Sequence, residues 1–277
     1  MLPSTVDRHT ARQRAVASLA ATALVGDVAG KLAHRGIPVM PLKGALLQHW
    51  LYDDPSDRPL TDVDLLVRPA ALHEAAELLE AAGYCRTRHS SVGGLVMQTP
   101  LGLALDLHAQ LFDRMRYRMP TDDLFARGSE DHALYGARVV LPSPLDVYAH
   151  LVGKFGSDHL NARSTARLDE IRRMGAHLDC SAETAARHLL HCGMRRVSRY
   201  VLPLVDRTLG DPFASQVCKR LPRDPIGRGI ATAAEWSLAR AAPRSWSGAV
   251  IAHALNDSVP HGLESGIRAL HERTRRG

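Results

Sequence analysis

The sequence changes character near residue 143, and this change limits the folds that the chain can adopt. Short apolar runs typical of strands occur only before it, at 37–42, 60–67, 84–87, 95–99, 103–111 and 138–141. After it, apolar residues recur at helical spacing, over 143–155, 164–174, 182–191, 194–209, 226–241 and 261–275. We therefore predict an α+β fold: a small mixed β-sheet with flanking helices in residues 1–142, followed by an all-helical domain in residues 143–277.

The first of these domains begins with a long helical pattern at 11–34, which ends at Gly36. With 277 residues, 45% of them hydrophobic, the chain can bury a large core and is not a disordered protein. The apolar run Val16–Val25 follows three arginines, as in a signal peptide, but the helical pattern continues through Asp27 and Lys31. Because the sequence contains no uninterrupted apolar run of about 18 residues, we expect a buried helix and no membrane partner.

Four cysteines in a chain of this length are too few for a disulfide framework, so we expect reduced thiols and a cytoplasmic protein. One pattern has the spacing of zinc ligands: His177-x2-Cys180 followed by His188-x2-His191 and Cys192. Because the segment is predicted helical, these residues fall on several helix faces. Ordinary packing and surface histidines are therefore the favoured interpretation over zinc.

The charge of the chain is unevenly distributed. Residues 1–160 contain 16 Lys and Arg against 18 Asp and Glu, a balance of −2, whereas residues 161–277 contain 19 against 11, a balance of +8. A basic helical half, with Arg195, Arg196 and Arg199 on one stretch, is a candidate surface for an RNA backbone. The alternative is an arginine-rich helix face in solvent.

Three carboxylates lie within strand-like apolar runs. Asp62 and Asp64 alternate with Val63 and Leu65, so both side chains point to the same face of a strand. Asp106 lies in the run LALDLHAQL, and His108, two residues later, shares its face. Carboxylates in such runs are costly to bury without a cation.

Three carboxylates on neighbouring strands are a typical ligand set for two Mg²⁺ or Mn²⁺ ions bound to a triphosphate. The alternative is that these residues are caps or surface residues, since an Asp-x-Asp pair alone is common.

Two further positions suit phosphate binding. Lys43 and Gly44 follow a short predicted strand and begin a predicted helix, where a lysine and backbone N–H groups can meet phosphate oxygens. Arg58, four residues before Asp62, is a candidate phosphate clamp. The alternatives are a plain strand-to-helix turn and a loop salt bridge to a nearby aspartate.

In their order along the chain, these motifs resemble those of a known family. The string Leu42-Lys43-Gly44, Tyr52, Arg58-x3-Asp62-x-Asp64-Leu65-Leu66-Val67, Gly83-Tyr84 and Asp106-Leu107-His108 is similar to the bacterial family of uncharacterised nucleotidyltransferases. That family belongs to the DNA-polymerase-β-like nucleotidyltransferase superfamily. The motifs Leu141-Pro142-Ser143-Pro144-x-Asp146 and Arg167–Ile171 also resemble its helical portion, and the similarity covers about residues 30–175.

The resemblance implies an enzyme that transfers a nucleoside monophosphate from an NTP to a hydroxyl group of a small molecule, peptide or protein. Asp62, Asp64 and Asp106 would be catalytic metal ligands, with Asp106 also a candidate base and His108 an accessory residue. Lys43, Gly44 and Arg58 would bind the nucleotide, at a place where most of the superfamily carries a Gly-Ser turn. Two alternatives remain: an RNA-modifying nucleotidyltransferase of the toxin type, and a non-catalytic nucleotide-binding protein.

Overall fold

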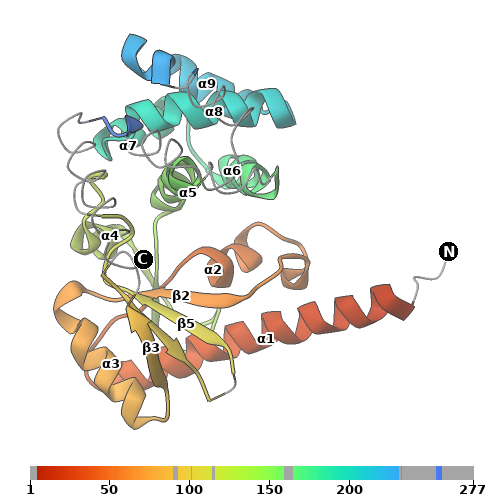
Figure 1. Cartoon of the computed structure of the whole chain (residues 1–277), viewed down its shortest axis with the longest axis vertical. Coiled ribbons are helices and arrows are strands. Elements are labelled where there is room, and N and C mark those ends of the chain that lie inside the picture. Colours follow the sequence, from red (N-terminus) through yellow and green to blue (C-terminus); the bar gives the residue numbers. More distant parts are fainter. Residues whose placement is uncertain are drawn as a thin grey trace, which may run out of the picture. The chain divides into compact units, whose positions relative to one another are not determined.

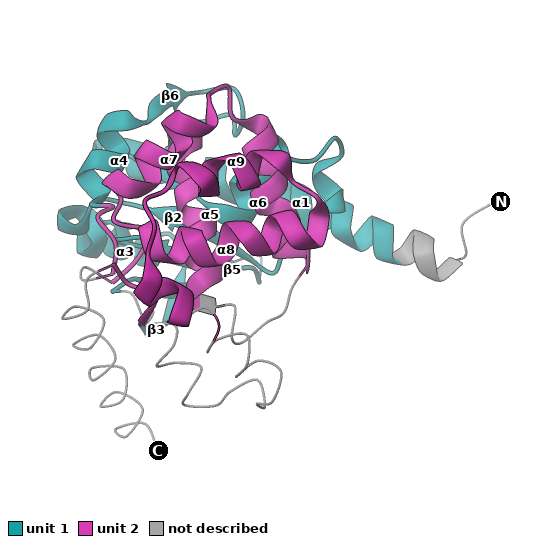
Figure 2. Ribbon diagram, turned by 90° about the horizontal axis from the view of Figure 1, so that it is seen from above, with its two compact units in different colours: residues 1–111, 120–143 teal, residues 112–119, 144–277 magenta. Residues whose placement is uncertain are grey.

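The computed structural model describes residues 5–89, 93–100, 102–113, 116–158, 165–230, 232 and 254–257. The chain forms two compact units, residues 1–111 with 120–143, and residues 112–119 with 144–277 (Figure 2). The division after Ser143 follows the change in sequence character, but residues 112–119 belong to the second unit. They pack there through edge-to-face ring contacts of Phe112 with Tyr117 and with His150.

Unit 1 contains a five-stranded sheet in the order β1-β2-β5-β4-β3 (Figure 1). Its strands are β1 (Met40–Pro41), β2 (Asp62–Leu66), β3 (Cys85–His89), β4 (Leu95–Gln98) and β5 (Ala104–His108). The central pair, β2 and β5, is parallel, and every other pair in this sheet is antiparallel. A second sheet contains β6 (Ser129–Asp131) and β7 (Val139–Leu141). This mixed sheet confirms the predicted α+β fold class.

The helices of unit 1 are α1 (Thr5–Ala33), α2 (Lys43–Trp50), α3 (Leu72–Ala81) and α4 (Thr121–Arg127), with short 3-10 turns η1 (Pro55–Asp57) and η2 (Pro69–Ala71). One face of the sheet is the core, formed by alternate apolar residues of the strands and covered by α1 and α3 (Figure 1). In β2 and β5 these residues are Val63, Leu65, Leu105 and Leu107. The intervening residues of both strands therefore point away from this core.

The stretch Thr10–Ala33 of α1 is long and apolar enough to cross a membrane by length and composition, with a mean hydropathy of 1.4. The sequence prediction looked for an uninterrupted apolar run. The mean hydropathy of this helix is high although the helix contains charged residues. Its buried positions, among them Leu24, Val28 and Leu32, belong to the core of unit 1. A core helix passes the same test, so the finding is weak as an indication of a membrane.

The described part of unit 2 contains helices and no strand, as the sequence predicts. They are α5 (Pro144–Asp158), α6 (Thr165–His177), α7 (Ala182–His191), α8 (Arg195–Leu209) and α9 (Pro212–Arg220). The helix predicted at 226–241 is described only as the helical segment 225–230 and residue 232, and the helix predicted at 261–275 lies outside the described residues.

Candidate functional site

The parallel pairing of β2 with β5 brings the predicted carboxylates together. The register places Asp64 opposite Asp106 and Asp62 opposite Ala104. Because side chains alternate along a strand, Asp62, Asp64, Asp106 and His108 all lie on the sheet face opposite the core. The acidic face of the sheet thus follows from the alternation seen in the sequence, together with one parallel register.

Asp64 is the most buried of these carboxylates, with 4% of its surface exposed. Its Oδ1 lies 2.7 Å from Nε2 of His108 and 2.5 Å from Nζ of Lys43. Burial alone would raise the pKa of the Asp64 carboxyl, but the hydrogen bonds and charges of His108 and Lys43 outweigh it and hold the pKa well below its usual range. Asp64 is therefore a fixed negative charge in the site.

Asp106 is half-buried, and its two carboxylate oxygens differ. Oδ2 lies 3.4 Å from Nε2 of His108, whereas Oδ1 is buried and has no hydrogen-bond partner among the described residues. Burial raises the pKa of the Asp106 carboxyl, and the negative charges of Asp64 and Asp62 act in the same direction. A buried carboxylate oxygen is normally satisfied by a hydrogen-bond donor or a cation.

Asp62, the first residue of β2, is exposed, and its Oδ1 accepts a hydrogen bond of 3.0 Å from Oγ1 of Thr61. The side chains whose ligand atoms lie within 4.8 Å of one another are Asp64, Asp106 and His108. His108, an accessory residue in the sequence prediction, is therefore in the centre of the cluster, and Asp62 lies at its exposed side.

Two cationic side chains lie at the start of α2, Lys43 of the helix itself and Arg58, which follows η1. Lys43, the first residue of α2, has a positive φ of 42° that is uncommon for a residue with a side chain, and its ammonium group contacts Asp64. Gly44 is buried, and a Cβ atom there would collide with Nη1 of Arg58 and with the side chain of Leu60. Only a glycine allows the Arg58 guanidinium to come this close to the helix start, so the structure brings Lys43, Gly44 and Arg58 together.

These residues can hold a divalent cation. Asp64 and Asp106 face each other across adjacent strands, Asp62 is on the same sheet face, and Oδ1 of Asp106 has no described partner. Carboxylate oxygens are the ligands that Mg²⁺ and Mn²⁺ prefer. The residues present therefore fit such an ion.

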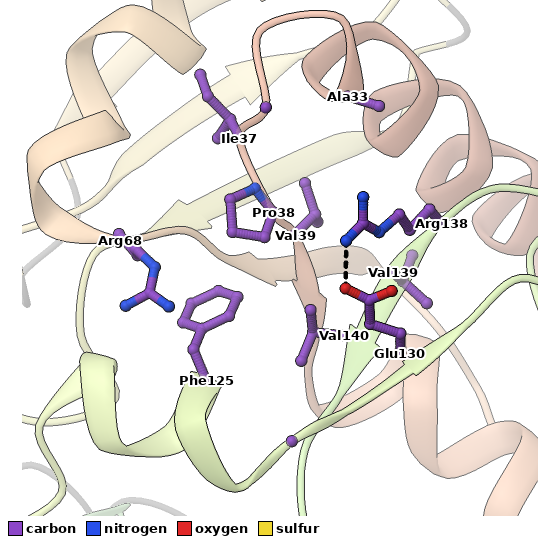
Figure 3. A pocket seen from close by; sticks show the side chains of 12 residues that line it. Ala33, Ile37, Pro38, Val39, Arg68, Phe125, Glu130, Arg138, Val139 and Val140 are labelled. Atoms are coloured by element: carbon purple, nitrogen blue, oxygen red, sulfur yellow. Dashed lines mark hydrogen bonds and ion pairs between the residues drawn. The ribbon is translucent and has the colours of Figure 1, made fainter.

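The cavity of unit 1 shown in Figure 3 is separate from this cluster. It has a volume of about 360 Å³ and lies beside the segment that leads into β1, between Pro38, Phe125 and Val140. Arg68 lies over the ring of Phe125, and Arg138 pairs with Glu130. Among the described residues that line it there is none of the predicted site residues.

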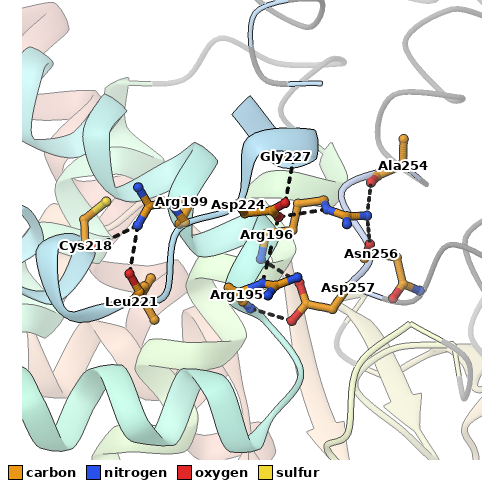
Figure 4. A network of polar contacts seen from close by, with 10 residues as sticks. All are labelled: Arg195, Arg196, Arg199, Cys218, Leu221, Asp224, Gly227, Ala254, Asn256 and Asp257. Atoms are coloured by element: carbon orange, nitrogen blue, oxygen red, sulfur yellow. Dashed lines mark hydrogen bonds and ion pairs between the residues drawn. The ribbon is translucent and has the colours of Figure 1, made fainter. Parts of the chain in front are cut away.

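The arginines proposed from the sequence as an RNA surface have partners inside unit 2 (Figure 4). Arg196 is buried, and its guanidinium donates to Asp224 and to the carbonyl of Asn256. Arg199 donates to the carbonyl oxygens of Cys218 and Leu221. Arg196 is therefore used inside unit 2, whereas Arg199 is only half-buried, and RNA binding by this helix stays a prediction.

The chain belongs to a family described as uncharacterised nucleotidyltransferase, whose model matches residues 3–210. No curated protein matches. Among solved structures, the antibiotic-resistance factor ANT(2'')-Ia is similar with 13% identity and a TM-score of 0.46, over 62% of this chain and 90% of that one. An antigenic nucleotidyltransferase-like protein from Paracoccidioides brasiliensis is similar with 17% identity and a TM-score of 0.45, over 76% of this chain and 94% of that one.

Proposed function

We propose that this protein is a metal-dependent nucleotidyltransferase that transfers a nucleoside monophosphate from an NTP to a hydroxyl group of a small molecule, peptide or protein. The observation that carries the proposal is the pair Asp64 and Asp106, opposite each other in adjacent parallel strands, with one buried oxygen of Asp106 left without a described partner. Membership of the nucleotidyltransferase family supports the reaction class.

Asp62, Asp64 and Asp106 would hold Mg²⁺ or Mn²⁺. When bound, such ions would neutralise the triphosphate and lower the pKa of the acceptor hydroxyl. The contact of Lys43 with Asp64 supports a role for Lys43 beside this site: when the nucleotide enters, its ammonium can turn from the carboxylate to a phosphate oxygen. Arg58, against Gly44 at the start of α2, would add a second cation for the triphosphate.

In the transfer itself, the acceptor oxygen attacks the α-phosphorus, the bond to the bridging oxygen breaks, and pyrophosphate leaves. The acceptor's proton must go to a base. Asp106 is the proposed base, since its buried Oδ1 is available to accept a hydrogen bond. His108, with Nε2 between Asp64 and Asp106, would hold both carboxylates in position.

The test is a screen of the purified protein with each NTP labelled in the α-phosphate, with Mg²⁺ or Mn²⁺, against pools of small molecules, proteins and total tRNA. Label in a small-molecule or protein fraction, lost on removal of the metal, is the expected result. Absence of transfer in every pool, with nucleotide still bound, would support a non-catalytic nucleotide-binding protein instead.

An RNA acceptor is the second candidate, and the balance of +8 in residues 161–277 is the observation that favours it. Label in the tRNA pool, with an affinity that falls steeply as salt rises, would identify it. A small-molecule acceptor would show only a shallow salt dependence.

We also propose that the protein acts in the cytoplasm, since none of the four cysteines, all of which the structure describes, forms a disulfide. Cell fractionation with an antibody to the chain tests this proposal, and recovery in the membrane fraction would contradict it.

A further inference from the structure

Unit 2 contains a second cluster of potential metal ligands, formed by Asp146, His188 and Cys192. Asp146 lies in the first turn of α5, His188 lies in the last turn of α7, and Cys192 is the C-cap of α7. His188 and Cys192 are four residues apart, so their side chains lie on the same side of the helix. The three ligand atoms lie within 4.8 Å of one another. We propose that these residues bind a zinc ion.

The two distances from His188 within the cluster are close to those of a tetrahedral site. Nε2 of His188 lies 3.0 Å from Oδ1 of Asp146 and 3.6 Å from Sγ of Cys192. With zinc bonds of about 2.0 Å to nitrogen and oxygen and about 2.3 Å to sulfur, tetrahedral angles separate nitrogen from oxygen by about 3.3 Å and nitrogen from sulfur by about 3.5 Å. An ion at the centre therefore needs only small movements of the side chains.

The same geometry argues against a Cys-His-Asp catalytic triad. In such a triad the carboxylate binds one ring nitrogen of the histidine and the nucleophile binds the other. Here the single atom Nε2 of His188 faces both the carboxylate and the sulfur. Three ligand atoms that converge on one point are the arrangement of a metal site.

Burial and charge favour the ion as well. Asp146 is 1% exposed and Cys192 is fully buried. A buried carboxylate is costly unless it is paired, and a thiolate next to it would add a second negative charge. With Zn²⁺ the carboxylate, the thiolate and a neutral imidazole sum to zero charge. Sulfur and nitrogen ligands select zinc over Mg²⁺.

The local backbone holds two of the ligands in place. Gly193, with a φ of 68°, ends α7, and the N–H of Met194 donates to the carbonyl of Leu189. The N–H of Arg118 donates to the carbonyl of Cys192 at 2.8 Å. A zinc ion here would tie the start of α5 to the end of α7, with water as the fourth ligand.

The proposal is tested on the full chain, produced with zinc in the medium and without a histidine tag. After dialysis against a weak chelator, elemental analysis should find about one zinc per chain. Replacement by Co²⁺ should give the visible bands of a tetrahedral ion and the near-ultraviolet charge-transfer band of a thiolate ligand. Cys192→Ser should abolish the charge-transfer band and weaken zinc binding at least about tenfold.

Two matched variants serve as controls. Cys218→Ser changes a cysteine of α9 outside the cluster, and His191→Gln changes the exposed histidine three residues after His188. Both should retain zinc and the cobalt spectrum, whereas His188→Gln should lose them. Equal losses in Cys218→Ser and Cys192→Ser would overturn the proposal, as would a parent protein without zinc.

Should Cys192→Ser fail to fold, X-ray absorption of the unmodified zinc protein decides the question. The expected spectrum contains one sulfur neighbour at about 2.3 Å and nitrogen or oxygen neighbours at about 2.0 Å. A spectrum with only nitrogen and oxygen neighbours would exclude Cys192 as a ligand and contradict the proposed site.

Discussion

The two units each contain a buried aspartate whose Oδ1 lies close to Nε2 of a histidine, at 2.7 Å for Asp64 and His108 and at 3.0 Å for Asp146 and His188. The surroundings differ. In unit 1 the other partners are the carboxylate of Asp106 and the ammonium group of Lys43, on neighbouring strands and a helix start. In unit 2 the third group is the thiol of Cys192, and the cluster is formed by two helices, α5 and α7.

This difference in the third partner separates the two proposed roles. Carboxylates on the sheet face opposite the core offer hard oxygen ligands, which suit Mg²⁺ or Mn²⁺. A thiol and an imidazole in a buried corner between helices offer soft ligands that suit zinc in a structural role. The same aspartate–histidine pair can therefore serve chemistry in one unit and stability in the other.

Of the substitutions considered, Asp64→Asn should reduce nucleotidyl transfer most, and it should act only on the cluster in unit 1. It removes the charge that faces both Lys43 and His108, so we expect transfer to fall by about 10³-fold or more, while zinc content is unchanged. Asp122→Asn, which alters an exposed ion pair with Arg68, is the control and should retain activity. Near-normal turnover of Asp64→Asn in single-turnover assays would exclude the proposed site.

Asp106→Ala should separate chemistry from binding within the same cluster. We expect the rate of transfer to fall by about 10²-fold, because the proposed base is lost, while NTP affinity changes by only a few-fold. His108→Ala should cost much less, because His108 acts through the carboxylates. Calorimetric titration measures NTP affinity, and a single-turnover assay measures the rate of transfer. Loss of NTP binding in Asp106→Ala would contradict the assignment of Asp106 to chemistry and not to NTP binding.

Asp224 is a third buried aspartate to compare with Asp64 and Asp146. It is paired with an arginine, Arg196, and not with a histidine. Burial would raise its pKa, but the N–H of Gly227 and the guanidinium of Arg196 outweigh it and hold the pKa below its ordinary value. Its contribution to stability is therefore present above the unfolded pKa of about 3.9 and is lost as the pH falls through the lower folded value.

Asp224→Asn should accordingly lower the free energy of unfolding at pH 7 by about 2 kcal/mol, a factor of about 30 in the folding equilibrium. The loss should shrink as the pH falls below about 4, and it should vanish once the pH is below the lowered pKa of the folded parent. Urea unfolding at several pH values measures it. A pH-independent difference between the variant and the parent protein would show that the charge of Asp224 is not the cause.

Lys43→Ala should have the smallest effect. Loss of one charge-assisted contact to the triphosphate should raise KM for the NTP about tenfold, about 1.4 kcal/mol, with kcat less affected. Lys31→Ala, which removes an exposed pair with Asp27 on α1, is the matched control. An unchanged KM in Lys43→Ala would leave Lys43 only its contact with Asp64.

Much of the fold could be predicted from periodicity. Alternation along 60–67 and 103–111 gives the polar face of β2 and β5, and the predicted hairpin of β4 and β5 is confirmed by their antiparallel pairing. The short elements α4 and β6 and the helix α9 were not predicted. The seven-residue α4 has two exposed aspartates in its first turn and is anchored by the hydroxyl of Thr121, which donates to the carbonyl of Ala109, a contact with no local pattern.

The two candidate sites also combine features that are visible in the sequence with features that only the tertiary structure provides. Asp62, Asp64, Asp106 and His108 share a face because each pair lies at strand spacing, but the parallel register that opposes Asp64 to Asp106 is a tertiary feature. In unit 2, the four-residue spacing of His188 and Cys192 is visible in the sequence. Their partner Asp146 precedes His188 by 42 residues, and only the packing of α5 on α7 brings it there. The sequence pattern His177, Cys180, His188, His191 and Cys192 therefore contained two residues of the cluster but not Asp146.

The most direct test of the central claim follows the two ends of the triphosphate separately. With an NTP labelled in the α-phosphate, the account predicts label on the acceptor; with a γ-label, it predicts label only in released pyrophosphate, in equal amount. Both signals should disappear in Asp64→Asn and persist in Cys192→Ser. Transfer of the γ-label to the acceptor, or undiminished α-label transfer by Asp64→Asn, would contradict nucleotidyl transfer at the carboxylate cluster.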